Sequence, residues 1–238
     1  MEMKLIERRN IMEYNEYEST AKSIWDGGVK SIPQWEPSKC HPSDVNLIED
    51  INATNPDLVI DMGCGTNFFK GRIQNVIGYD ISDIEGPDYI ASTRQMWEDK
   101  IFEESSADYI FCYGPLSFGD EDFINEQIGY MKYWAKPNAY ILIRVPQPLK
   151  ITDDIKSNYN EYIPQKYDKF SVKNGNYYIR GPYVQAHYFW TQDIIVEAEK
   201  LFGFSRRPDR DIEVVDYSIE GYDPAMKQTL CWWWKVNK

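Results

Sequence analysis

Cysteine and histidine are scarce in this sequence of 238 residues. It holds two histidines and four cysteines, namely Cys40, Cys64, Cys112 and Cys231. The cysteines are far apart, so they form neither a disulfide framework nor the paired spacing of a zinc site. We therefore predict no metal centre, and we interpret Cys64 as a small side chain in a tight turn rather than a redox group.

Long apolar stretches are also missing. No run of eighteen apolar residues occurs, and residues 1–10 are rich in charge. These absences argue against a membrane-spanning helix and against a secretory signal peptide. The sequence predicts a protein of the cytoplasm with no membrane partner.

Basic residues are too few for a typical nucleic-acid-binding protein. The chain has 26 Lys and Arg against 38 Asp and Glu, giving a net charge of −12. Tight docking on duplex nucleic acid normally needs a basic face that neutralises phosphates. A local patch at Lys166, Lys169, Lys173 and Arg180 lies among tyrosines that could stack bases, but a solvated insertion is the favoured interpretation. A small-molecule or protein partner is therefore preferred over duplex nucleic acid.

A buried strand followed by a glycine turn is the strongest signal that is present. The apolar run Leu58 to Ile60 ends in Asp61 and breaks into Gly63-Cys64-Gly65. Glycine at these places lets the backbone turn sharply and approach a ligand, and we expect its amide groups to be available there. A second apolar run ends in Asp80, whose carboxylate can accept hydrogen bonds from two ribose hydroxyls. The pattern predicts a nucleotide pocket.

The third glycine position distinguishes among adenosine ligands. A dinucleotide fingerprint would place glycine at position 68, where the sequence has Phe68. The phosphate-binding pattern Gly-x-x-x-x-Gly-Lys-Ser/Thr is absent. Asp61 would repel a pyrophosphate but suits a ligand that carries an ammonium group and no phosphate. S-adenosylmethionine is such a ligand, and we predict it as the cofactor.

With these residues in view, the chain resembles the class I S-adenosylmethionine-dependent methyltransferases. Residues 61–65 resemble the family's first motif, Asp80 its ribose acid, residues 108–114 its fourth strand, and residues 134–145 its helix, turn and fifth strand. The likeness covers roughly residues 55–146. Asn67 is a departure, because many family members carry a third glycine there, although asparagine tolerates left-handed dihedrals.

A narrower likeness concerns residues 63–73 and 114–119, which are similar to small methyltransferase-like proteins encoded by tailed bacteriophages. If the protein is phage-encoded, as this likeness implies, the predicted location is the cytoplasm of the bacterial host. The residues that the family resemblance places in the cofactor site are Asp61, Gly63, Cys64, Gly65, Asn67, Asp80, Ile81, Tyr113 and Gly114.

The resemblance implies an α/β fold of the Rossmann-like class I methyltransferase type. Its sheet would be mostly parallel and seven-stranded, with an antiparallel closing hairpin and helices on both faces. The length suits one domain over residues 1–238. We divide it into an N-terminal cap (1–40), a cofactor-binding core (41–149), a substrate-side insertion (150–186) and a closing helix with strands (187–238).

Periodicity predicts several further elements. Helices are expected at 42–51 with Ser43 as N-cap, at 124–134 with an apolar stripe at 124, 128, 131 and 134, and at 191–201 between Thr191 and Gly203. A hairpin is predicted between 170–172 and 177–179 around an Asn-Gly turn. The last strands, 212–218 and 228–234, include three consecutive tryptophans, which we expect to alternate between the two buried faces of the sheet.

Catalytic residues are less clear than the cofactor site. Methyl transfer needs alignment more than acid–base chemistry, so a catalytic side chain is not required. The candidates are Tyr113 and Ser117 after the fourth strand, His187 as a possible general base, and Arg144 as a holder of an acidic acceptor. His187 could equally be a packed residue, and Arg144 could pair with an internal acid. The segment Tyr113-Gly114-Pro115-Leu116 matches neither DNA-methyltransferase motif.

These observations predict methyl transfer from S-adenosylmethionine to an unidentified small molecule, protein or modified nucleotide. Two alternatives remain. The chain could be a non-catalytic S-adenosylmethionine-binding interaction protein, or an aminopropyltransferase, against which the lack of a paired-Asp motif after the fourth strand counts.

Overall fold

The computed structural model describes residues 42–83, 86–117, 119, 121–146, 177–180, 185–188, 190–216 and 228–238, together with Ser19, Lys22 and Asp26. Several predictions lie outside the described residues. They are most of the N-terminal cap, most of the 150–186 insertion with Lys166, Lys169 and Lys173, and the predicted strand at 170–172.

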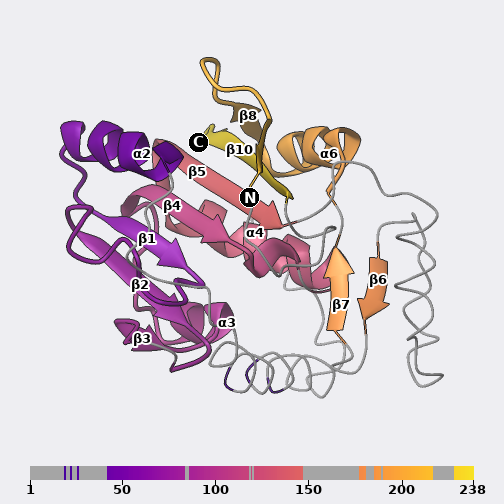
Figure 1. Ribbon diagram of the computed structural model, residues 1–238, viewed down its shortest axis with the longest axis horizontal. Helices are drawn as coiled ribbons and strands as arrows, with labels where there is room; N and C mark the ends of the chain where they lie inside the picture. Colours follow the sequence, from indigo (N-terminus) through magenta and orange to yellow (C-terminus); the bar gives the residue numbers. More distant parts are fainter. Residues whose placement is uncertain are drawn as a thin grey trace.

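A mostly parallel sheet forms the centre of the protein (Figure 1). Its strands are β1 (Val59–Met62), β2 (Val76–Asp80), β3 (Tyr89–Ile90), β4 (Ala107–Tyr113), β5 (Ala135–Pro146), β8 (Phe204–Arg206), β9 (Glu213–Asp216) and β10 (Gln228–Val236). The order is β3-β2-β1-β4-β5-β10-β8, and β9 also pairs with β10. Strands β1 to β5 pair in parallel, whereas β10 runs antiparallel to β5, β8 and β9. The predicted parallel sheet with an antiparallel closing pair is confirmed.

Within the described residues the sheet has eight strands, which corrects the predicted number of seven. The short strands β3 and β8 gave no pattern in the sequence, since two or three residues are too few to show a period. The closing strand β9 begins at Glu213, one residue after the predicted start, and residues 217–218 of that prediction lie outside the described part.

Helices cover both faces of the sheet, as predicted. They are α2 (Pro42–Ala53), α3 (Thr93–Glu98), α4 (Glu121–Trp134) and α6 (Gln192–Phe202). Leu47 and Ile51 of α2 pack on one face with Val59 and Phe111. The other face is covered by α3, α4 and α6, and the predicted stripe of α4 at 124, 128, 131 and 134 is fully buried there.

The ends of the helices follow local chemistry. Thr191 caps α6 by accepting a hydrogen bond from the N–H of Ile194, and Gly203 ends the helix at φ +70°, both as predicted. Ser43 is not the N-cap of α2, because that helix begins one residue earlier at Pro42. Proline is favoured in the first turn of a helix, where its missing N–H costs nothing.

The three consecutive tryptophans alternate across β10 as predicted. Trp232 and Trp234 are buried with α4 and α6, and Trp233 is buried on the α2 face. A strand that is covered on both sides by helices needs large apolar side chains on both faces. These residues are therefore part of the core rather than a carbohydrate-stacking surface.

A separate two-stranded sheet lies on the side toward which β1, β4 and β5 point (Figure 1). It pairs β6 (Tyr177–Arg180) with β7 (Gln185–Tyr188) in antiparallel fashion. The strand predicted at 177–179 is therefore present, and its partner among the described residues is β7. The predicted partner, 170–172, lies outside them. We call these two strands the β6–β7 pair.

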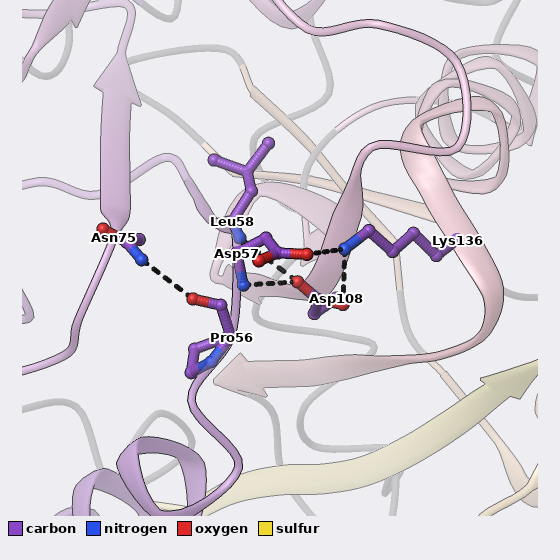
Figure 2. Close-up of polar contacts among 6 residues, drawn as sticks. All are labelled: Pro56, Asp57, Leu58, Asn75, Asp108 and Lys136. Carbon is purple, nitrogen blue, oxygen red and sulfur yellow. Dashed lines mark hydrogen bonds and ion pairs between the residues drawn. The ribbon is translucent and has the colours of Figure 1, made fainter.

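The opposite end of the sheet is closed by a charged clamp (Figure 2). The Nζ atom of Lys136 contacts Asp57 at 2.7 Å and Asp108 at 2.8 Å. Asp108 also accepts hydrogen bonds from the backbone N–H groups of Asp57 and Leu58. The clamp thus joins the starts of β1, β4 and β5. Burial alone would raise the pKa of Asp108, but the bonds from Lys136 and the two N–H groups outweigh it and hold that pKa below its usual range.

The clamp predicts a pH-dependent effect of replacing Lys136. Lys136→Met should lower the free energy of unfolding by about 1 kcal/mol at pH 7, because partly exposed ion pairs contribute little. A carboxyl with a depressed pKa stabilises the fold above its unfolded pKa and loses that effect as the pH falls. The difference from the parent protein should therefore narrow toward pH 3 in urea unfolding experiments. An equal difference at both pH values would contradict this account.

Candidate functional site

The turn after β1 is held in a conformation that requires glycine. Gly63 has φ +67° and Gly65 has φ +51°, both in the left-handed region. Gly63 is also covered by the ring of Pro115, which begins the short helix η2 (Pro115–Ser117) after β4. A Cβ on Gly63 would lie 2.3 Å from Cγ of Pro115, which is closer than real carbon atoms approach. The turn therefore lies directly against the segment that follows β4.

The backbone amides of this turn are occupied, contrary to our expectation. The N–H groups of Gly63 and Cys64 donate to the carbonyl of Tyr79 at 2.9 and 3.0 Å. The N–H of Gly65 donates to the Asp80 carboxylate at 2.9 Å. The close spacing of β1 and β2 brings these acceptors within reach, which the sequence pattern did not reveal. No amide of residues 63–65 is left for a phosphate, and this weighs against a dinucleotide ligand.

The chain after the glycine turn does not form a helix. Residues 65–75 run through successive turns before β2, closed by hydrogen bonds such as Lys70 N–H to the carbonyl of Asn67. Asn67 adopts φ +51°, as its identity allowed, and its amide Nδ2 donates to the carbonyl of Gly86 at 3.1 Å. This hydrogen bond fastens the loop to residue 86. A pyrophosphate would find no helix N-terminus here.

Asp61 is a buried acid at the end of β1. Only 3% of the residue is exposed. Burial and, to a smaller extent, the negative charge of nearby Asp80 together raise the pKa of its carboxyl to about 7. An ionised carboxylate in this place would be stabilised by a cation. The site therefore suits a ligand that brings positive charge.

Asp80 is pre-oriented at the end of β2. One carboxylate oxygen accepts from Gly65 N–H and the other from Ser82 N–H, each at 2.9 Å. Burial raises the pKa of Asp80, and these two bonds lower it in part. The backbone N–H of Ile81 also lowers this pKa, and the two carboxylate oxygens, with about four acceptor positions between them, keep acceptor capacity for a ligand. Two vicinal hydroxyl groups, as on a ribose, would use these positions.

Two described residues of the N-terminal segment contact the chain just after Asp80. The Nζ atom of Lys22 donates to the carbonyl of Ile81 at 3.1 Å. Asp26 accepts a hydrogen bond from the hydroxyl of Ser82 and pairs with Lys22 at 3.3 Å. The contacts place these residues beside the acid that we predicted for the cofactor.

Cys64 lies between the two acids. Burial and the charges of Asp61, Asp80 and Asp88 all raise the pKa of its thiol. The thiol therefore stays protonated at neutral pH, and a thiolate nucleophile is disfavoured. Its small side chain packs against Gly78, where an added Cβ would lie 2.9 Å away. This agrees with the interpretation of Cys64 as a space-saving turn residue.

Tyr113 and Arg144 lie side by side at the ends of β4 and β5, and the arginine is already engaged. They are direct partners in the register of the two strands. The guanidinium of Arg144 lies 4.4 Å from the Tyr113 ring centre and pairs with buried Asp44 of α2. Of the two roles considered for Arg144, the internal ion pair is the one observed. Phe69 and Phe111 pack around the tyrosine ring, with centroids at 5.5 and 6.0 Å.

The other candidates are arranged around η2. Gly114 precedes it with φ +99°, and the buried Ser117 donates its N–H to the carbonyl of Gly114. Strand β7, which contains His187 opposite Tyr178, runs beside η2. The structure therefore brings the segments of these candidates to one edge of the sheet.

Sequence reasoning missed two residues of this region. Asp44 pairs with Arg144, and the Nε1–H group of Trp190 donates to the carbonyl of Leu116 at 2.8 Å. Both contacts join residues that are far apart in the sequence. Pro115 lies in the segment after the fourth strand that we singled out, but its contact with Gly63 was not predicted.

The contact between Gly63 and Pro115 predicts different outcomes for two glycines of the same loop. Gly63→Ala would combine an unfavourable positive φ with a clash, and should destabilise the protein by about 2 to 4 kcal/mol. Gly71 has φ +74° but open space around it, so Gly71→Ala should cost only about 1 kcal/mol. Urea unfolding of both variants checks this, and equal losses would show that Pro115 does not restrict the turn.

Known structures share this arrangement of strands and helices. The 1,6-didemethyltoxoflavin-N1-methyltransferase of Burkholderia thailandensis, crystallised with 1,6-didemethyltoxoflavin and S-adenosylhomocysteine, aligns with a TM-score of 0.61 at 13% identity. The alignment covers 97% of this chain and 92% of that one. Magnesium protoporphyrin IX methyltransferase of Synechocystis, with bound S-adenosylhomocysteine, aligns with a TM-score of 0.56 at 12% identity over 92% of this chain and 100% of that one.

A third similar structure is a protein of Methanosarcina mazei described as an S-adenosylmethionine-dependent methyltransferase. Its TM-score is 0.56 at 14% identity, and the alignment covers 84% of this chain and 99% of that one. No protein-family model matches the sequence, and no curated protein matches it. At these identities the structural likeness establishes the fold, which is the Rossmann-like fold of class I methyltransferases.

Proposed function

We propose that the protein binds S-adenosylmethionine at the carboxyl ends of β1, β2 and β4 and transfers its methyl group to an acceptor. The observation that carries the proposal is the buried carboxyl of Asp61 beside Asp80, next to a glycine turn whose amides are already used. A cationic nucleoside without phosphates fits this set of groups. The three similar structures are described as methyltransferases, and two of them hold S-adenosylhomocysteine, which supports the same choice.

The residues have separate tasks in this proposal. Asp61 supplies negative charge for the amino group of the ligand, and Asp80 accepts hydrogen bonds from the ribose hydroxyls. Gly63 and Gly65 leave room for close approach of the ligand to the turn. Bound S-adenosylmethionine supplies an electrophilic methyl group, whose bonding pair stays on sulfur when an acceptor lone pair forms the new bond. Alignment of the acceptor then determines the rate more than any acid or base does.

The acceptor is proposed to be a small molecule or a protein rather than duplex nucleic acid. The net charge of −12 supports this choice, because phosphate backbones would be repelled. Among the helices that fall within the described residues, none is both long and apolar enough to cross a membrane. The cytoplasmic location and the bacteriophage likeness stay predictions from the sequence.

Aminopropyl transfer is the weaker enzymatic alternative. It would need acids near the end of β4 to hold an amine acceptor, and residues 113–117 contain none. A binding protein without turnover is the other alternative. Incubation with labelled S-adenosylmethionine and a panel of acceptors that includes 1,6-didemethyltoxoflavin separates methyl transfer from both alternatives, because only a methyltransferase releases S-adenosylhomocysteine in proportion to acceptor.

Calorimetric titration tests the cofactor directly. S-adenosylmethionine and S-adenosylhomocysteine should bind at micromolar concentrations, and NAD should not, because the turn offers no amide to a pyrophosphate. Asp80→Ala should weaken binding of both sulfur ligands by about 1 to 3 kcal/mol, as expected for charge-assisted hydrogen bonds. Binding of NAD with equal affinity, or unchanged affinity in the Asp80 variant, would contradict the proposed site.

Replacement of Asp61 should stabilise the empty protein while weakening cofactor binding. A carboxyl whose folded pKa is raised to about 7 binds a proton more tightly in the folded state, so stability falls as the pH rises from about 4 to 7. Asp61→Asn removes this penalty and should raise the free energy of unfolding at pH 8 by about 1 to 3 kcal/mol. Urea unfolding at pH 5 and pH 8 measures it, and a variant that is less stable at pH 8 would contradict the assignment.

The same carboxyl links cofactor affinity to pH. The parent protein should bind S-adenosylmethionine roughly fivefold to tenfold more tightly at pH 7.5 than at pH 6, because Asp61 must ionise. Asp61→Asn serves as the control, since its affinity should be lower and nearly independent of pH over this range. A flat profile in the parent protein would remove the role of Asp61 as the counter-charge.

A further inference from the structure

The helix η2 lies between the proposed cofactor turn and the β6–β7 pair. On one side, the Pro115 ring covers Gly63 so closely that no methyl group would fit between them. On the other side, β7 runs beside η2. Between these two contacts Leu116 is completely buried in the core. A displacement of the glycine turn therefore has to be taken up by η2, because close-packed interiors transmit strain rather than absorb it.

Trp190 joins η2 to the end of the β6–β7 pair. It follows β7 by two positions, and its Nε1–H donates to the carbonyl of Leu116 at 2.8 Å. The residue is 3% exposed. Its ring is fixed by Trp232 and Trp234, with centroids at 5.1 and 6.0 Å. A rigid side chain thus donates a directional hydrogen bond from the exit of β7 to a carbonyl within η2.

We infer that Trp190 is a positioning residue that couples the cofactor turn to the β6–β7 pair, through Pro115 and the carbonyl of Leu116. The inference rests on the proposed function, since the turn is taken to bind S-adenosylmethionine. Its consequence is that cofactor binding steadies β7 beside η2, where the acceptor would meet the methyl group. The alignment of the acceptor then depends on whether the cofactor is bound. The link runs through protein contacts at Pro115, Leu116 and Trp190 rather than through a contact between cofactor and acceptor.

Hydrogen–deuterium exchange on the full chain tests this coupling with S-adenosylhomocysteine as the probe. In the parent protein, the probe should slow exchange at residues 63–65 and, by at least about threefold, at the amides of Gln185–Tyr188. Trp190→Phe keeps an aromatic ring in the tryptophan cluster but removes the N–H donor. In that variant the probe should still slow residues 63–65, while residues 185–188 should exchange as they do without probe.

Trp232→Phe is the matched control. Trp232 belongs to the same cluster, is fully buried, and its Nε1 atom has no hydrogen-bond partner among the residues that the structure describes. The substitution therefore perturbs the packing without removing a bond to η2, and it should behave as the parent protein does. Pro115→Ala is a second variant that acts at the other end of the connection. In this variant, which retains Trp190, the probe should also fail to slow exchange at residues 185–188. The test therefore does not depend on the folding of one variant.

The outcomes separate the inference from the function on which it rests. If the probe fails to slow residues 63–65 in the parent protein, both are overturned. Slowing at 63–65 without slowing at 185–188 in the parent protein overturns the coupling alone. If the probe still slows exchange at residues 185–188 in the Trp190 and Pro115 variants, the coupling is overturned, because direct contact would explain the effect. If the Trp232 control loses this slowing equally, the coupling is also overturned, because general packing would explain it.

Discussion

The buried carboxyl of Asp61, at the end of β1, is the constraint on which the rest of the site depends. Asp61 is nearly inaccessible, and both burial and the neighbouring Asp80 oppose its ionisation. Such an arrangement costs stability in the empty protein, and proteins tolerate that cost mainly where a ligand removes it. In the proposed site, a phosphate beside this acid would add to the repulsion, whereas an ammonium group would relieve it.

The hydrogen bonds of the glycine turn lead to the same conclusion by a separate route. Nucleotide-binding turns often present free N–H groups and a helix N-terminus to a pyrophosphate. Here Tyr79 and Asp80 accept the N–H groups of residues 63–65, and successive turns replace the helix. The turn therefore presents a backbone surface without free N–H groups at residues 63–65. Under the proposed function, specific recognition falls to the two carboxylates.

The sequence predicted the strands and turns of this region because their signals are local. Strand ends marked by Asp61 and Asp80, glycines with positive φ and a threonine cap can each be identified from a few neighbouring residues. The short strands β3 and β8 were missed because they have no period to detect. The use of the turn amides, the Asp44–Arg144 pair and the Trp190–Leu116 bond were missed for a different reason. Each joins segments that only the folded topology brings together.

The pairing of Arg144 narrows the chemistry of the acceptor. An unpaired arginine at the end of β5 would have offered a strong bidentate site for a carboxylate or phosphate. Instead its charge is balanced by Asp44, and the Tyr113 ring covers one face of the guanidinium. Breaking a buried pair to bind an acidic acceptor would leave Asp44 uncompensated, which costs several kcal/mol. For an acceptor that binds near this strand end, the Asp44–Arg144 pair therefore favours a neutral or cationic group over an acidic one.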